Sequence, residues 1–247
     1  MRNRKILILG GTGDALKLAK VLIATGYDVI TSLAGVTQAP RLPEGHIRRG
    51  GFGGADGMAD YLMSEGIAAV VDATHPYAAQ ISRHAAQAAK ACGLYYARIE
   101  RPAWREEPGD RWIHVATVAD AVSALPSGAR ALATIGRKEI AGFFAREDIS
   151  GVARMIERPA VDVPSRWTLV LARPPFALPE ELKLIEDHSI THLVAKNSGG
   201  DETRAKIIAA REKAIPVIMI ARPPKPEAPA FSSAEMLLPP FKRALSP

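Results

Sequence analysis

Cysteine is almost absent from this sequence, since Cys92 is the only one among 247 residues. A single cysteine excludes an internal disulfide and argues against a cysteine-based metal site. The N-terminus is basic, but the apolar run that follows it is too short for a signal peptide. These features predict a cytoplasmic protein.

Long apolar runs and dense basic runs are absent as well. No apolar stretch approaches the roughly 20 residues that a membrane-spanning helix needs, so we expect no membrane association. The net charge is +6, yet the lysines and arginines are spread along the chain, which argues against nucleic-acid binding. A basic surface of this kind suits small polyanionic ligands, such as phosphates and polycarboxylates.

Several catalytic motifs are also missing. No tyrosine is followed by lysine four residues later, so the catalytic pair of short-chain dehydrogenases is absent. The sequence contains no G-x-x-x-x-G-K-[ST], H-E-x-x-H or G-x-S-x-G motif. His188 and His192 are four residues apart, but a predicted break between a helix and a strand separates them. We therefore predict no metal site.

Apolar strand-like segments alternate with amphipathic helix-like segments along the whole chain. This alternation predicts an α/β fold with two domains built on mostly parallel sheets. The segment 105–111 is charged and rich in turn-forming residues, which is typical of a linker. We accordingly predict one domain over residues 1–108 and a second over residues 109–247.

The most informative stretch begins with the apolar residues 6–9, which are typical of a strand buried on both faces. The strand runs into a turn made of Gly10, Gly11, Thr12 and Gly13. Glycine permits positive φ in a tight turn, and the helix that begins there offers a seat for a phosphate. The full dinucleotide fingerprint needs a third glycine where Leu16 stands. The turn therefore fits a dinucleotide site and a turn without a nucleotide equally well.

The second predicted strand, residues 27–34, ends without an acidic residue. Thr31 and Ser32 stand near its carboxyl end, and Arg41, Arg48 and Arg49 follow. An acid at this end would accept hydrogen bonds from the ribose and would repel a 2′-phosphate. Its absence favours NADP over NAD. The alternative is that these residues only cap a loop.

Polar side chains also follow the predicted strand at residues 67–72. Asp72, Thr74, His75 and Tyr77 gather where open α/β sheets bind their ligands. The imidazole of His75 titrates near neutral pH, which suits acid–base chemistry. A structural hydrogen bond near a helix start is the alternative role for this histidine.

Two more segments carry residues suited to anions. The loop 196–201 combines a lysine with small polar and glycine residues, so that Lys196 could meet a phosphate or carboxylate. Arg101 stands close to Trp104, and an arginine beside an aromatic ring can hold a large, flat, anionic ligand. Solvated arginines at strand ends and a simple glycine turn are the alternatives.

Four of these segments resemble the signature stretches of the precorrin-6A reductase family. They are residues 10–14, 72–78, 101–104 and 196–200, whose sequences are GGTGD, DATHPYA, RPAW and KNSGG. The glycine cluster 50–54, the Arg222-Pro223 pair and the overall length extend the resemblance over nearly the whole chain. DATHP and KNSGG are the specific motifs, because a glycine turn alone is common to many families.

The resemblance implies an enzyme of cobalamin biosynthesis that uses NADPH to reduce one double bond of precorrin-6A, giving precorrin-6B. It implies two Rossmann-like three-layer domains with the active site in a cleft between them. A tetrapyrrole with many carboxylate arms would suit the basic character of the chain, and neighbouring pathway enzymes are possible partners. The motifs do not separate this family from its cobalt-precorrin counterpart.

The loops and the resemblance together define the predicted site. The predicted cofactor contacts are Gly10, Gly11, Thr12, Gly13, Asp14, Thr31, Ser32, Leu33, Ala34, Gly35, Asp72, Ala73, Thr74, Lys196, Asn197, Ser198 and Gly199. The predicted substrate contacts are His75, Tyr77, Arg101, Trp104, Arg137, Lys196 and Gly200. His75, Tyr77 and solvent are the candidates for the proton donor. Another NADP-dependent reductase of an anionic substrate and a non-catalytic NADP sensor remain the alternatives.

Overall fold

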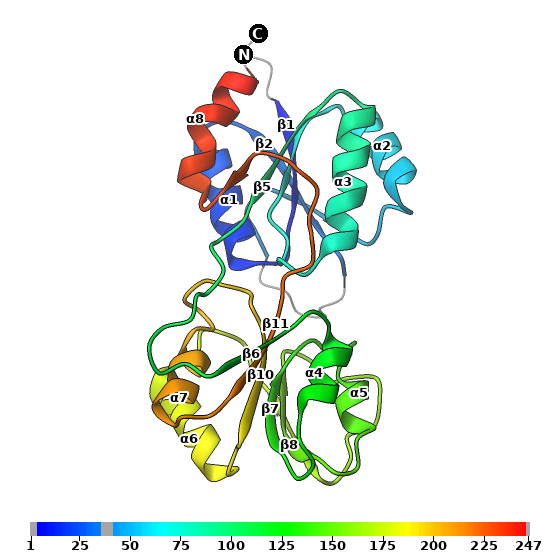
Figure 1. Ribbon diagram of the computed structural model, residues 1–247. Coiled ribbons are helices and arrows are strands. Elements are labelled where there is room, and N and C mark those ends of the chain that lie inside the picture. Colours follow the sequence, from blue (N-terminus) through cyan, green and yellow to red (C-terminus); the bar gives the residue numbers. More distant parts are fainter. Residues whose placement is uncertain (1–3, 36–41, 246–247) are drawn as a thin grey trace. The chain divides into compact units, whose positions relative to one another are not determined.

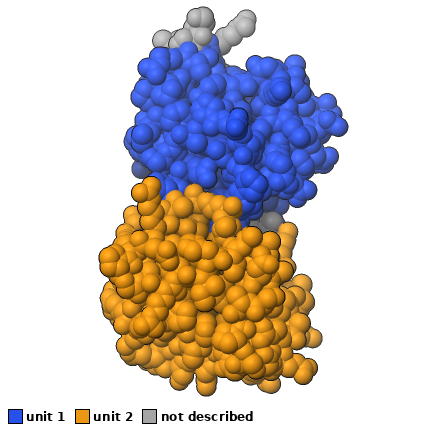
Figure 2. Space-filling model, in the orientation of Figure 1, with its two compact units in different colours: residues 1–102, 223–247 blue, residues 103–222 orange. Residues whose placement is uncertain are grey.

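A computed structural model describes residues 4–35 and 42–245 (Figure 1). The chain divides into two compact units, which Figure 2 shows in different colours. Unit 1 consists of residues 1–102 and 223–247, and unit 2 consists of residues 103–222.

Unit 1 is a three-layer α/β unit with a six-stranded sheet in the order β12-β5-β4-β1-β2-β3. All strand pairings described in this sheet are parallel. Helices α1 and α8 cover one face and α2 and α3 the other (Figure 1). The strands are β1 (Lys5–Leu9), β2 (Asp28–Leu33), β3 (His46–Arg49), β4 (Ile67–Asp72), β5 (Tyr95–Ile99) and β12 (Ala230–Phe231). The helices are α1 (Gly13–Ala24), α2 (Ala55–Ser64), α3 (Ala79–Ala91) and α8 (Ala234–Ala244).

The central strand β1 explains the uninterrupted apolar run of residues 6–9. Ile6 and Ile8 pack into the cluster with α1 and α8, whereas Leu7 and Leu9 pack into the cluster with α2 and α3. All four side chains are at most 2% exposed. A strand covered by helices on both faces has no solvent-facing position, so it keeps no polar alternation.

Unit 2 has the same three-layer design, with a six-stranded sheet in the order β6-β11-β10-β7-β8-β9. Its described pairings are also parallel, and α4 and α5 cover one face while α6 and α7 cover the other. The strands are β6 (Trp112–Val115), β7 (Arg130–Thr134), β8 (Ser150–Met155), β9 (Trp167–Leu171), β10 (His192–Lys196) and β11 (Val217–Ile220). The helices are α4 (Val118–Ala124), α5 (Ala141–Phe144), α6 (Leu178–Asp187) and α7 (Ala205–Glu212). The prediction of two parallel-sheet α/β domains is confirmed.

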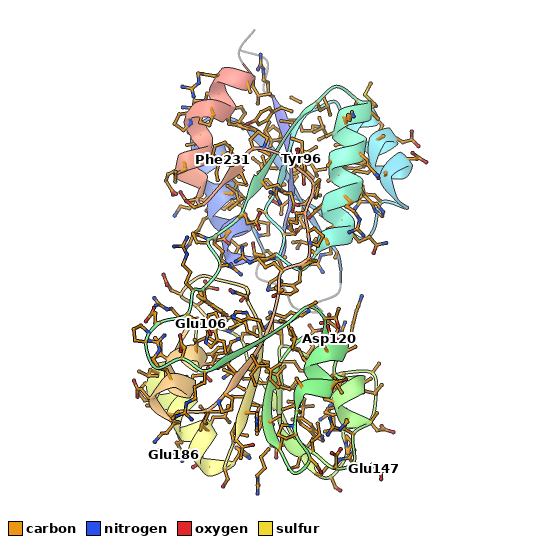
Figure 3. The ribbon with its side chains drawn as sticks, in the orientation of Figure 1. Tyr96, Glu106, Asp120, Glu147, Glu186 and Phe231 are labelled. Atoms are coloured by element: carbon orange, nitrogen blue, oxygen red, sulfur yellow. The ribbon has the colours of Figure 1, made fainter. Side chains whose placement is uncertain are left out.

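The domain limits differ from the prediction of 1–108 and 109–247, because the C-terminal segment returns to unit 1. Strand β12 pairs in parallel with β5. On α8, Leu237 and Phe241 are 0% exposed, and the Phe241 ring contacts Tyr27 and Tyr95 edge-on. Figure 3 shows Phe231 beside this helix. The described residues 223–245 thus complete the core and the sheet of unit 1.

The charged segment 105–111 belongs to unit 2 and is held by ion pairs. Glu107 pairs with Arg204 and, at 2.7 Å, with Arg211. Asp110 lies 2.9 Å from Arg211 Nε. These carboxylates therefore hold segment 105–111 against α7. The sequence analysis predicted this segment only as a linker.

Candidate functional site

The carboxyl edge of the unit 1 sheet contains a topological switch point. From β1, the chain proceeds through β2 to β3 on one side, and β4 and β5 lie on the other. Open α/β sheets bind ligands outside such a reversal of strand order. The glycine turn after β1 and the 72–77 loop after β4 flank this point, and a hydrogen bond of 2.7 Å from Thr12 Oγ1 to the Ala73 carbonyl joins them.

The glycine turn is shaped by close packing and by positive φ. A Cβ on Gly10 would lie 2.7 Å from Thr31 Cγ2, a side chain that is 0% exposed. Gly11 has a φ of 104° with open space around it, so its conformation, not crowding, requires glycine. Thr12 caps α1 by accepting a hydrogen bond from the Ala15 amide at 3.1 Å. The turn therefore presents the start of α1, with its positive dipole end, at the switch point.

Asp14 stands in the first turn of α1, where its negative charge would oppose a bound phosphate. Arg101, which follows β5, holds this carboxylate at 2.8 Å. Arg101 thus brings positive charge to the glycine turn. The sequence analysis suggested that Arg101 and Trp104 hold one ligand together. The structure assigns Arg101 to unit 1 and Trp104 to unit 2.

The carboxyl end of β2 is acid-free, as predicted, and Arg48 organises the loop beside it. Ser32 accepts a hydrogen bond from Arg48 at 3.3 Å, and the same guanidinium donates to the carbonyls of Gly50 and Gly51 at 2.7 and 2.6 Å. It also stacks on the Phe52 ring, with 3.7 Å from Cζ to the ring centroid. Arg48 is therefore occupied by its own loop.

Arg49 is an exposed cation at this end of the sheet. It ends the edge strand β3 and is in register with Leu33 of β2. The residues that continue β2, Ala34 and Gly35, include a glycine with a φ of 72°. Arg41, which the sequence analysis also named here, lies outside the described residues.

The 72–77 loop is built on the buried carboxylate of Asp72. This side chain is 0% exposed and accepts hydrogen bonds from the Thr74 amide at 3.0 Å and the Thr74 hydroxyl at 2.6 Å. Tyr96 on β5 donates to its other oxygen at 3.2 Å. Figure 3 shows Tyr96 at the middle of unit 1. Burial and the negative charge of Asp72 raise the pKa of Tyr96, which keeps the phenol protonated.

His75 and Tyr77 lie at the outer end of this loop. Helix α3 begins at Ala79, and no side chain caps it, because Thr74 turns its hydroxyl to Asp72. His75 is exposed, and its Nδ1 accepts a hydrogen bond from the Tyr77 amide at 3.3 Å. The neutral imidazole therefore carries its proton on Nε2.

One residue of this edge went unnoticed in the sequence. Lys225, from the segment that returns to unit 1, places Nζ 3.6 Å from Asp72 Oδ2, and its side chain is 6% exposed. The proline-rich surroundings of Lys225 gave no indication of this role, because the contact spans 153 residues of sequence, from 72 to 225.

Unit 2 has its own switch point between β7 and β10, and the loop 196–200 lies there. Trp104 fixes this loop: its indole donates to the Gly200 carbonyl at 2.9 Å, and its amide donates to the Asn197 side chain at 2.8 Å. Asn197 returns a bond to the Trp104 carbonyl at 3.0 Å. Trp104 is only 9% exposed, so its ring supports the loop from the core and does not offer a face to a ligand.

Other contacts hold the same loop from its opposite side. Arg222 donates to the Asn197 and Ser198 carbonyls at 2.8 and 3.0 Å. Ser198 is 7% exposed, and Gly199 and Gly200 have φ of 67° and 76°. The backbone conformation of this loop is therefore strongly fixed, and the Asn197 side chain helps to hold it through its hydrogen bonds with Trp104.

The remaining predicted contacts of unit 2 are ion-paired at the carboxyl edge. Lys196 pairs with Glu139, which stands in the loop after β7. Arg137, in the same loop, pairs with Glu157 at 3.2 Å. These pairs leave a dense set of charges at the edge, with both cations partly exposed.

A separate charged cluster is buried in unit 2, and it too was not predicted. Arg154 contacts Glu181 at 2.7 Å, with side-chain exposures of 7% and 0%. Lys206 lies 5.6 Å from the Trp104 ring centroid. Burial, strengthened by Arg154 and opposed by Glu181, lowers the pKa of Lys206 to about 7.

Two further structural findings concern the described residues as a whole. No group of three or more His, Cys, Asp or Glu side chains among them could hold a metal ion. No helix in residues 4–35 and 42–245 combines the length and apolarity needed to cross a bilayer.

Comparison with known proteins gives consistent matches along the chain. A family model described as precorrin-6x reductase CbiJ/CobK matches residues 5–239. The precorrin-6A reductase of Rhodococcus erythropolis is 48% identical over 91% of both chains. That of Rhodobacter capsulatus is 42% identical over 90% of this chain and 89% of its own length. The cobalt-precorrin-6A reductase of Priestia megaterium is 30% identical over 88% and 90%. A solved structure of CobK precorrin-6A reductase matches with a TM-score of 0.92 and 39% identity, covering 98% of this chain and 97% of that one.

Proposed function

This chain belongs to the precorrin-6x reductase family and is an oxidoreductase that reduces precorrin-6A in cobalamin biosynthesis; we propose that NADPH is its hydride donor. The family name, a reductase, implies a reductant, and a glycine turn at the switch point of a parallel sheet favours a nicotinamide cofactor. The resemblance noted in the sequence is thereby confirmed. The product is precorrin-6B, in which one double bond has taken up a hydride and a proton.

One observation carries the cofactor assignment: the glycine turn lies at the switch point of a sheet with the order β3-β2-β1-β4-β5-β12. The turn and the start of α1 would hold the pyrophosphate. Arg101 would offset the charge of Asp14 there. The bound NADPH supplies the hydride, and the protein's task is to orient and surround it.

The choice of NADPH over NADH rests on the carboxyl end of β2. No acidic side chain stands there, and the exposed Arg49 ends the neighbouring strand β3 in register with Leu33. A guanidinium in this position suits a 2′-phosphate. Residues 31–35 would border the ribose, with the backbone and Ser32 as contacts, because Thr31 is fully buried.

The second substrate is a corrin precursor, a polyanion that suits the basic loops at the carboxyl edges. We assign Lys196 and Arg137 of unit 2 to its carboxylates, and Trp104 and Asn197 to supporting the 196–200 loop. His75 and Tyr77 would contact the substrate from unit 1. His75 is the proposed proton donor; it would act as the imidazolium, with Nε2–H donating and the Tyr77 contact at Nδ1 given up. The predicted location of the site between the two domains stays a prediction.

The relatives also favour one form of the substrate. Relatives named precorrin-6A reductase reach 48% and 42% identity, whereas a cobalt-precorrin-6A reductase reaches 30%. We therefore propose the metal-free macrocycle. A cytoplasmic location, suggested by the lone cysteine, and transfer of product to neighbouring pathway enzymes complete the proposal.

Equilibrium titration of the protein with NADPH and NADH tests the cofactor assignment. We expect NADPH to bind at least tenfold more tightly, since a charged hydrogen bond contributes about 1.5–3 kcal/mol. Arg49→Glu should remove most of this preference, whereas Lys183→Met, far along the chain on the exposed α6 surface, should preserve it. Equal affinity of the wild-type protein for the two cofactors would contradict the proposal.

A further inference from the structure

Lys225 reaches the carboxyl end of β4 from a segment that completes unit 1. Pro223 and Pro224 precede it, and proline keeps the preceding residue extended. The chain then continues to β12, whose Phe231 carbonyl accepts a hydrogen bond from the Glu100 amide at 2.8 Å. The backbone on the C-terminal side of Lys225 is thus anchored on β5.

The lysine side chain supplies the charge that balances Asp72. Nζ lies 3.6 Å from Asp72 Oδ2, and the two side chains are 6% and 0% exposed. A buried carboxylate without a cation would be strongly unfavourable. The neighbouring charges Arg98 and Glu100, on β5 and just after it, pair with each other at 3.0 Å, and both also act electrostatically on Lys225. The ion pair of Asp72 within the described residues is with Lys225.

The same ammonium group orients the Thr74 hydroxyl. Thr74 Oγ1 lies 3.5 Å from Lys225 Nζ, from which it accepts, and it donates to Asp72 Oδ1 at 2.6 Å. With both partners in place, the hydroxyl has one orientation. Thr74 is followed directly by His75, and Ala73 before it is bonded to Thr12 of the glycine turn.

We propose that Lys225 is a positioning residue for the cofactor, acting through Asp72 and Thr74 to fix the 72–77 loop at the switch point. This inference rests on the proposed NADPH site in unit 1. Lys225 itself is too buried to contact the cofactor. Removing the Lys225 ammonium leaves Asp72 charged and the Thr74 hydroxyl without its donor. The 72–77 loop is then no longer held in one conformation.

The experiment compares four variants: Lys225→Met, Asp72→Asn, the double variant, and Lys225→Arg. Each is measured for thermal unfolding, NADPH dissociation constant, and kcat and KM for NADPH. We expect Lys225→Met to weaken NADPH binding about tenfold or more, in line with the loss of a charged hydrogen bond. We expect the double variant to recover thermal stability, because no unpaired charge remains, but not NADPH affinity. Lys225→Arg should restore part of the affinity.

The controls separate the possible failures. Lys183→Met removes a lysine whose side chain is 74% exposed and should behave as wild type. If Lys225→Met and the double variant both bind NADPH as tightly as wild type, Lys225 serves only charge balance and the inference is overturned. If the wild-type protein does not bind NADPH, the proposed cofactor site fails first.

Discussion

Replacing the buried Lys206 by methionine should stabilise unit 2, and the gain should depend on pH. The lysine is 5% exposed and lies near Arg154 and Glu181. Within the described residues, the buried atoms Arg154 Nη2 and Glu181 Oε2 have no hydrogen bond. Burial is the main cause that lowers the pKa of Lys206 to about 7. Methionine has a similar unbranched shape and carries no charge to desolvate.

The size of the effect follows from the difference between the folded and unfolded pKa values. An unfolded lysine titrates near 10.4, and each pKa unit corresponds to about 1.4 kcal/mol. At pH 6 both states are protonated, so the folded protein bears the full cost of about 4–5 kcal/mol. Between pH 7 and 10 the unfolded state binds the extra proton, so wild-type stability rises with pH. At pH 9 the remaining cost is about 2 kcal/mol, and the advantage of the variant shrinks accordingly.

Urea unfolding followed by tryptophan fluorescence measures this directly, because Trp104, Trp112 and Trp167 all lie in unit 2. We expect Lys206→Met to raise the free energy of unfolding of unit 2 more at pH 6 than at pH 9, by up to about 3 kcal/mol. The exposed Lys183→Met should change it by less than about 0.5 kcal/mol at either pH. A variant that is destabilised at pH 6, or whose gain is the same at both pH values, would show that the buried charge of Lys206 does not lower the stability of unit 2.

Three further predictions concern the loops. Gly10→Ala should weaken NADPH binding about tenfold and lower the free energy of unfolding by about 1–3 kcal/mol, since its Cβ would lie 2.7 Å from Thr31 Cγ2. Calorimetric titration measures the affinity and thermal unfolding the stability. An unaltered dissociation constant for NADPH would contradict a role of this turn in cofactor binding. Asn197→Ala should destabilise unit 2 by about 2 kcal/mol, measured by tryptophan fluorescence, because it removes both hydrogen bonds to Trp104. His75→Gln should lower kcat by about a hundredfold with little change in NADPH affinity; an unchanged kcat in steady-state assays would assign the proton to another donor.

Local patterns were enough to predict the elements and to single out the unit 1 loops as a candidate site. The apolar run of residues 6–9, the glycine turn after it and the polar 72–77 loop can each be recognised from a few consecutive residues. The parallel sheet then places strand carboxyl ends at one edge, which is why Gly10 and Asp72 could be assigned to the same region. The bond between Thr12 and Ala73 confirms that these two loops meet.

Contacts between distant segments could not be predicted in the same way. Lys225 is separated from Asp72 by the whole of unit 2, and its neighbours are prolines with no strand or helix period. Trp104 follows Arg101 by three positions, which suggested one shared ligand. The division between units falls within that interval, so Trp104 packs in the unit 2 core while Arg101 pairs with Asp14. A single sequence carries no sign of either arrangement.

Reduction of precorrin-6A with NADPH can be observed directly. The most direct measurement mixes purified protein, NADPH and precorrin-6A without oxygen, and follows the loss of NADPH absorbance together with the tetrapyrrole spectrum. We expect one NADPH to be oxidised for each macrocycle converted to precorrin-6B, with NADH far less effective. A protein that binds NADPH but leaves both spectra unchanged would contradict it.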